Sequence, residues 1–342
     1  MSSGDIATTV ESIARAQLRD GCIPWFEGGH ADPWDHVEAA MALSVGGCTD
    51  EAEGAYDWLA KTQRPNGSWP AKVVRGRIAD ETLDANFCCY VATGAYHHWL
   101  ATKDIVYLTR MWPVVERAVD FALDLQAEWG GIFWARDAKQ KPWPAALLTS
   151  SSSIYLSLRC AIATAEILGC ERPDWELSLS LLASAIRDRE LKFADKKRFS
   201  MDWYYPILSG ALDHVTARQR IDERWDVFVV DGLGIRCVSD RPWITTAETC
   251  ELVLALDRVG LTAEAIQMFT WVQYLRAPDG SYWTGATFPD GVLWPRERTT
   301  WSAAAVVLAA DALSHASPTS GLFRGVGLPA PLDLSEPIAD AL

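Results

Sequence analysis

The sequence lacks the features of several common protein classes. No apolar run approaches the roughly 18 residues that a membrane span requires. The polar start of the chain, residues 1–17, has neither the basic nor the apolar segment of a signal peptide. The eight cysteines follow no disulfide or zinc spacing, so we expect buried free thiols and a cytoplasmic protein. No long Ser/Gly/Pro run precedes residue 317, so we expect one domain over residues 1–316.

Basic residues are also in short supply, and the formal net charge is -14. This sign disfavours nucleic acid and an anionic membrane surface as partners, because both carry negative charge. Aromatic residues, in contrast, are plentiful, with 17 Trp, 9 Tyr and 10 Phe. Aromatic rings build cores, and they also offer flat faces to ligands. The sequence leaves the oligomeric state open, a dimer being one option.

An internal repeat organises the chain. Residues 35–69 align without a gap on residues 248–282, and eleven of the paired positions are identical, among them Glu38/Glu251, Trp58/Trp271 and Gly67/Gly280. Asp35 falls on Glu248, and extending the same register pairs Asp84 with Glu297. Each copy is typical of a helix, a tight turn and a second helix. A repeat of this length indicates that one helical hairpin is used several times.

Apolar spacing predicts two alternating sets of helices. Segments with small residues and few charges, which we expect to be buried, are 34–46, 80–101, 149–169, a helix from about 201, 244–258 and 296–314. Amphipathic segments lie between them at 5–18, 50–63, 103–127, 173–191, 215–224 and 262–276. The alternation predicts an all-α (α/α)6 barrel, a toroid of six helical hairpins, over 1–316. The Pro- and Gly-rich tail, 317–342, is predicted to be extended on the surface and partly disordered at its end.

A recurring Q-x-x-x-G pattern marks the ends of several amphipathic helices. It occurs at Gln17–Gly21, Gln63–Gly67 and Gln126–Gly130, with a degenerate copy at Arg276–Gly280, and an aromatic residue follows each glycine. We interpret each copy as a helix end with a left-handed glycine turn, which is a structural role.

In such a toroid the buried helices all begin at one end, and acidic residues gather at these positions. Asp35 and Glu248 enter their helices at equivalent places and are the predicted catalytic pair, with Asp84 and Glu297 in reserve. Glycoside hydrolysis needs a proton donor for the leaving oxygen and a second carboxylate. The sequence does not decide the roles; we favour Glu248 as acid and Asp35 as base. A wide cavity favours inversion.

Further residues near these helix starts are candidate sugar ligands, because carboxylates bond hydroxyls and rings cover the apolar faces of sugars. The predicted substrate-binding residues are Trp34, His36, Asp84, Asp202, Tyr205, Trp243, Trp294 and Glu297. A structural interpretation competes for every acid, since the helix dipole favours acids in a first turn by about 0.3–1 kcal/mol. For Glu38 and Glu251 we expect a buried structural role. No metal ligands and no cofactor are predicted.

Two family resemblances follow from particular stretches. Gln63 to Trp69, QRPNGSW, resembles the QW repeat of squalene–hopene cyclases, but the D-x-D-D and D-D-x-x-D motifs of terpene cyclases are absent. DPWDHVEAAMAL (32–43) and RPWITTAETCELVLAL (241–256) resemble the (α/α)6 glycoside hydrolases, most of all the mycobacterial methylmannose polysaccharide hydrolases. That resemblance implies endo-cleavage of α-1,4-linked (methyl)mannose in the cytoplasm, with Asp35 and Glu248 as the acid pair.

Three other functions stay open at this point. An isoprenoid-handling toroid would need a dry, apolar cavity. A sugar epimerase of this architecture would need paired histidines at repeat-equivalent positions, and the six His do not occupy them. A glycan-binding protein would share the aromatics without needing paired acids.

Overall fold

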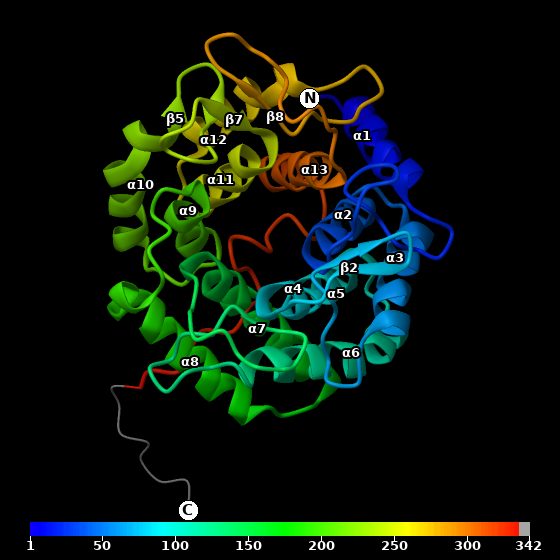
Figure 1. The fold of residues 1–342 in the computed structure, drawn as a ribbon, viewed down its shortest axis with the longest axis vertical. Coiled ribbons are helices and arrows are strands. Elements are labelled where there is room, and N and C mark those ends of the chain that lie inside the picture. Colours follow the sequence, from blue (N-terminus) through cyan, green and yellow to red (C-terminus); the bar gives the residue numbers. More distant parts are fainter. Residues whose placement is uncertain (335–342) are drawn as a thin grey trace, which may run out of the picture.

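In the computed structural model, which describes residues 1–334, six helices form a closed inner ring. They are α2 (Pro33–Val45), α5 (Val91–Thr102), α7 (Leu148–Leu168), α9 (Ser200–Leu208), α11 (Thr246–Arg258) and α13 (Thr300–Ser314). Each packs on the next, and α13 packs on α2 (Figure 1). Their sequences are rich in Ala, Ser and Leu and are buried along almost their whole length. The expectation of a helical protein with small-residue helices inside is therefore confirmed.

A second set of helices packs outside this ring. These helices are α1 (Ser3–Ala16), α3 (Thr49–Thr62), α6 (Ile105–Leu123), α8 (Pro173–Asp188), α10 (His214–Phe228) and α12 (Thr262–Trp271), the last continued by the 3-10 helix Val272–Leu275. Each contacts at least one inner helix. Because an outer helix carries the chain back after each inner one, the inner helices all begin at the same end of the ring, which we call the site end. Within residues 1–334 none of the helices combines the length and apolarity needed to cross a membrane.

The Q-x-x-x-G turns tie neighbouring outer helices together. The Gln63 amide donates to the carbonyl of Gly67 in its own turn and to that of Val114 on α6. Gln17 and Gln126 make the same pair of bonds in their turns. Gly67 has φ +88, and a Cβ there would overlap the carbonyl of Arg117. The structural role predicted for this motif is therefore confirmed, and its glutamine links successive hairpins.

Two predicted helix starts are wrong, because extended segments replace their first turns. The segment 80–101 is divided into β3 (Leu83–Asp84), the short helix α4 (Ala85–Cys89) and α5. β3 pairs with β4 (Ala135–Arg136), a partner about 50 residues away that no local pattern shows. The helix predicted from 296 begins at Thr300, where the Thr299 side chain caps it, so Glu297 lies in the preceding loop.

Short antiparallel ribbons join the helices at the site end. Besides β3–β4 they are β1 (Lys72–Val74) with β2 (Arg77–Asp80), β5 (Val229–Val230) with β6 (Gly234–Ile235), and β7 (Trp243–Thr245) with β8 (Gly285–Thr287). A 3-10 turn, Glu190–Lys192, follows α8. The ribbons give the loops in front of the inner helices a fixed backbone.

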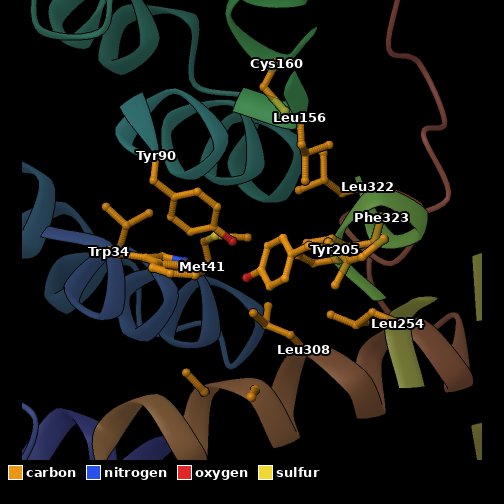
Figure 2. Packing of buried hydrophobic residues seen from close by; sticks show 14 of the residues in the cluster. Trp34, Met41, Tyr90, Leu156, Cys160, Tyr205, Leu254, Leu308, Leu322 and Phe323 are labelled. Carbon is orange, nitrogen blue, oxygen red and sulfur yellow. The ribbon is translucent and has the colours of Figure 1, made fainter. Parts of the chain in front are cut away.

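Residues 317–334, the C-terminal strap, cross the carboxyl ends of the inner helices. Leu322 and Phe323 are buried and pack toward Leu254 in the core (Figure 2). Arg258, at the end of α11, donates to the carbonyl of Phe323, and Arg159 of α7 donates to that of Pro329. The segment thus lies across this end of the ring with most of its residues at least partly exposed, and Leu322 and Phe323 are the part that enters the core. The disorder expected at the chain end falls in 335–342, outside the described residues.

Candidate active site

Asp32 builds the first turn of α2 and positions Asp35. One Asp32 oxygen, Oδ1, accepts the backbone N–H of Asp35 at 2.9 Å, and the other accepts Trp25 Nε1 at 2.6 Å. Pro33 occupies the first turn, where its fixed φ suits a helix start. Asp35 is held in this turn with 6% of its surface exposed.

The environment of Asp35 favours its protonated form. Burial raises the pKa of its carboxyl well above the usual value, and the charges of Asp32 and Glu38 raise it further. Its Oδ2 atom is buried and has no hydrogen-bond partner within residues 1–334. A neutral carboxyl with a free oxygen is what a proton donor requires.

Glu248 occupies the corresponding place on α11. It lies in the first turn, directly after β7, and is 5% exposed. Its charge acts on two neighbours. Burial raises the pKa of the Cys237 thiol, and the charge of Glu248 raises it further. The same charge adds to the raised pKa of Glu251. The structure therefore places Glu248 above Glu251 on one face of α11, as Asp35 stands beside Glu38 on α2.

Glu38 anchors a buried polar cluster one turn inside α2. Its Oε1 atom accepts Tyr90 Oη at 2.9 Å and Trp34 Nε1 at 3.2 Å. Burial raises its pKa to about 7 despite these bonds. Trp34, a predicted sugar ligand, is thus fixed by the acid one turn below it.

Glu251 completes the cluster from the opposite side. Its two carboxylate oxygens accept the hydroxyls of Tyr204 and Tyr205, the second at 2.7 Å. The rings of Trp34 and Tyr205 meet edge to face with centroids 5.7 Å apart, and Figure 2 shows Trp34, Tyr90 and Tyr205 converging from three sides. After burial, the charge of Glu38 is the largest influence raising the pKa of Glu251. We call these six residues, Trp34, Glu38, Tyr90, Tyr204, Tyr205 and Glu251, the Glu38–Glu251 network.

Asp84 and Asp202 lie at two further helix starts, Asp84 before α4 and Asp202 in the first turn of α9. Asp84 caps α4 by accepting the N–H of Phe87 at 3.0 Å, and burial raises its pKa to about 7. The charge of Asp32 also raises this pKa, so Asp84 faces the start of α2. Asp202 accepts the Thr149 hydroxyl at 2.6 Å, which joins the starts of α9 and α7.

One predicted ligand is wrong. His36 is fully buried, and both of its ring nitrogens are occupied, Nδ1 by the N–H of Ile23 and Nε2 by the carbonyl of Ala55. Its ring packs on Trp58 at 4.8 Å. It faces away from Asp35 because consecutive residues on a helix point about 100° apart.

The remaining predicted ligands lie in the rim loops. Trp243 donates from Nε1 to the carbonyl of Trp294 at 2.6 Å, and the Trp294 side chain is 54% exposed. Glu297 is partly exposed, and its carbonyl accepts the N–H of Thr284 at 3.0 Å. Burial lowers the pKa of His30, and the charge of Glu297 opposes this shift. The Glu297 carboxylate therefore lies toward the loop before α2, which contains His30.

Sequence reasoning missed Asp32 and Tyr90, whereas the buried structural role expected for Glu38 and Glu251 is confirmed. The Asp-Pro pair at 32–33 is a helix-start signal that could have identified the cap. Tyr90 carries no such signal, because its bond to Glu38 exists only through the packing of two helices. Within the described part of the chain, no three His, Cys, Asp or Glu side chains gather in a way that could hold a metal ion.

Comparison with known proteins adds a sequence relative. The chain is 53% identical over 325 residues to the MMP endo-(1,4)-3-O-methyl-α-D-mannosidase of Mycolicibacterium hassiacum, an alignment covering 95% of this chain and 90% of that protein. The comparison with protein-family models found no match.

Solved structures share the fold at low identity. A wild-type glycosidase superimposes with a TM-score of 0.71 at 15% identity, over 94% of this chain and 99% of the other. A glycosidase in complex with glucose gives 0.70 at 16% identity, over 92% and 99%. A D-mannose isomerase gives 0.67 at 11% identity, over 90% and 98%. At such identities the likeness concerns the fold alone, which hydrolases and isomerases evidently share.

Proposed function

The chain belongs to the family of the MMP endo-(1,4)-3-O-methyl-α-D-mannosidase, and on that basis we propose that it cleaves internal α-1,4 bonds in a chain of 3-O-methylmannose. It is a glycoside hydrolase, as the resemblance at 32–43 and 241–256 predicted. The observation that carries the proposal is the pairing of Asp35 with Glu248 at equivalent helix starts, over a buried carboxylate network. An isoprenoid site is disfavoured because acidic groups gather at the starts of α2 and α11, where a dry, apolar surface would be needed.

We assign the architecture to the (α/α)6 barrels. The closed contact cycle of the inner helices and the six surrounding helices support this assignment. Residues 1–316 are proposed as one catalytic domain, with 317–342 as an appended segment. Eight unpaired thiols are in keeping with a reducing compartment, and we propose the cytoplasm.

In the proposed reaction Asp35 is the general acid. Its protonated carboxyl donates to the glycosidic oxygen as the bond from that oxygen to the anomeric carbon breaks. This reverses the roles favoured from the sequence. The reversal is supported by the burial of Asp35 and by the charges of Asp32 and Glu38, which raise the pKa of its carboxyl and so favour the protonated form.

Glu248 is then the general base. It removes a proton from a water molecule, whose oxygen bonds to the anomeric carbon on the face opposite the leaving group, so the configuration inverts. The proton lost from Asp35 is balanced by the one that Glu248 gains, and exchange with solvent resets both. Placing the two acids on α2 and α11, with α13 between them in the ring, supports a separation that leaves room for this water.

The other contacts with substrate are proposed by position at the site end. Asp84 and Glu297 are partly exposed and can accept hydroxyls, whereas Trp34 and Tyr205 are buried and border the predicted sugar site. The full proposed set is Trp34, Asp84, Asp202, Tyr205, Trp243, Trp294 and Glu297. His36 is left out because its nitrogens are occupied.

The test is cleavage of a defined α-1,4-linked 3-O-methylmannose oligosaccharide, followed by chromatography and mass spectrometry of the products. The parent protein should release internal fragments, whereas Asp35→Asn and Glu248→Gln should each lose at least about a thousandfold in kcat. Glu51→Gln, an exposed acid on α3, should retain full activity. Parent-like activity in either site variant would refute the assignment of the pair.

A further inference from the structure

Two small sheets at the site end are built alike. β3 pairs with β4, and a third segment joins through a bridge between Arg136 and Pro142. β7 pairs with β8, and a third segment joins through a bridge between Ala286 and Leu293. In each sheet the first strand runs directly into a helix of the site, α4 after β3 and α11 after β7.

The hydrogen-bond register makes Trp143 and Trp294 equivalent residues of these sheets. The first residue of α4, Ala85, donates to the carbonyl of Trp134, and Thr246 of α11 donates to that of Thr284. One residue further along, the carbonyl of Ala135 accepts the N–H of Trp143 at 2.9 Å, and that of Gly285 accepts the N–H of Trp294 at 3.0 Å. The same position of the third segment therefore carries a tryptophan in both sheets.

Both tryptophans are exposed and supported by a second indole. The Trp143 side chain is 49% exposed and that of Trp294 is 54% exposed. Trp143 packs on Trp134 with centroids 5.5 Å apart, and Trp294 packs on Trp243 with centroids 4.8 Å apart, edge to face. Because bridged backbone and a partner ring hold each indole, little conformational entropy would be lost when a ligand covers it. Core packing alone does not call for half of an indole to face solvent.

The two pairs stand on opposite sides of the ring. One sheet precedes α4 and α7, and the other lies between α11 and α13, three steps away in the cycle of six inner helices. Figure 1 shows β7 and β8 on one side of the ring and α7 on the other. Asp35 and Glu248 lie at the same end of the ring as both sheets, so a polymer crossing that end would pass the acids between the two pairs.

We propose that the Trp134/Trp143 and Trp243/Trp294 pairs are distal subsites that grip a methylated polysaccharide on the two sides of the bond being cleaved. This inference rests on the proposed function. A neutral polymer has no charge to recognise, and each 3-O-methyl group adds an apolar patch that an indole face can cover. An enzyme that cuts inside a chain must hold sugars on both sides of the cut, which two opposed platforms allow and one would not.

The test compares long and short substrates in Trp143→Ala and Trp294→Ala. For a 3-O-methylmannose chain long enough to reach both sheets, each variant should raise KM about tenfold, equivalent to 1.4 kcal/mol. Turnover of the shortest cleavable oligosaccharide should stay unchanged in Trp143→Ala, because this substrate does not reach the sheet that carries Trp143. Phe at either position should restore most of the loss. Tyr274→Ala removes an exposed aromatic elsewhere, at 48% exposure, and should change neither substrate.

Binding measurements separate this inference from the proposed function. Calorimetry with the long chain is done in the Glu248→Gln background, with and without each tryptophan. Weaker binding of the long chain in both Trp→Ala variants supports the subsites. This holds even if the parent protein cleaves nothing, because absence of cleavage contradicts only the proposed function. An unchanged KM and an unchanged Kd for the long chain overturn the subsites. No binding of the long chain by the parent overturns both.

Discussion

At the scale of single residues, the chemistry depends on how buried carboxyls share protons. The placement of Asp35 and Glu248 in the first turns of two inner helices could be predicted from the repeat register, because equivalent positions of two helices fall on equivalent places in the ring. Their proposed roles could not, because burial of Asp35 and the charges of Asp32 and Glu38 become visible only when three dimensions are known. The same is true of the tyrosine hydroxyls on Glu38 and Glu251, which come from other helices.

The pH dependence of cleavage should report the proton on Asp35. As the general acid it must be protonated, so kcat/KM should fall as the pH rises through its raised pKa. Asp32→Asn removes a charge that raises this pKa, so the basic limb of the profile should move to lower pH. The asparagine oxygen can still cap α2.

The control for that profile is Asp50→Asn, an exposed acid on α3, which should leave the basic limb in place. A basic limb that stays where it is in Asp32→Asn would contradict the assignment of Asp35 as the acid.

Glu38 should make the fold less stable as the pH rises. Burial raises its pKa from 4.5 to about 7, so between these values the folded state holds a proton that the unfolded chain releases. The contribution of Glu38 to the free energy of unfolding is therefore highest below pH 4.5. It falls by on the order of 1 kcal/mol per pH unit as the pH rises to about 7. Glu38→Gln should flatten the slope in urea unfolding at pH 5, 6 and 7, whereas exposed Glu51→Gln should keep it. Equal slopes in all three proteins would exclude Glu38 as the source.

At the scale of elements, local signals predicted helices well and their starts poorly. Periodicity and the Q-x-x-x-G stops placed the helix ends within a few residues. The start of the segment predicted at 80–101 failed because pairing of Leu83 and Asp84 with Arg136 and Ala135 is a long-range contact. Local propensity depends on neighbouring residues, so it cannot predict pairing with a strand about 50 residues away.

The glycine of a Q-x-x-x-G turn should be far less replaceable than other glycines with positive φ. Gly67→Ala combines φ +88 with an overlap on the Arg117 carbonyl, and it should cost ~2–4 kcal/mol of unfolding free energy. Gly47→Ala, at φ +74 with open space around it, should cost only ~1 kcal/mol. Urea midpoints at constant m-value measure both. Equal costs would mean that φ strain alone, and not the contact between hairpins, explains the motif.

At the scale of the whole molecule, the ring has two unlike ends. The site end holds the acids, the small sheets and the exposed tryptophans. The other end is covered by the C-terminal strap, where Leu322 and Phe323 are buried and Arg159 and Arg258 bind strap carbonyls. The repeat predicted the arrangement of hairpins. It could not predict how the C-terminal strap covers one end, because residues 317–334 have no counterpart in the first copy. Because the strap covers one end, the proposed substrate would approach Asp35 and Glu248 from the other end.

The most direct test of the central claim is proton NMR of the anomeric signals during cleavage of the α-1,4-linked 3-O-methylmannose oligosaccharide. If Asp35 is the acid and Glu248 the base of an inverting reaction, the new reducing ends should appear first as the β anomer and then equilibrate. Early appearance of the α anomer would contradict the account, because it would require a covalent intermediate on one carboxylate. Absence of any new reducing end with the parent protein would contradict the assignment of the substrate itself.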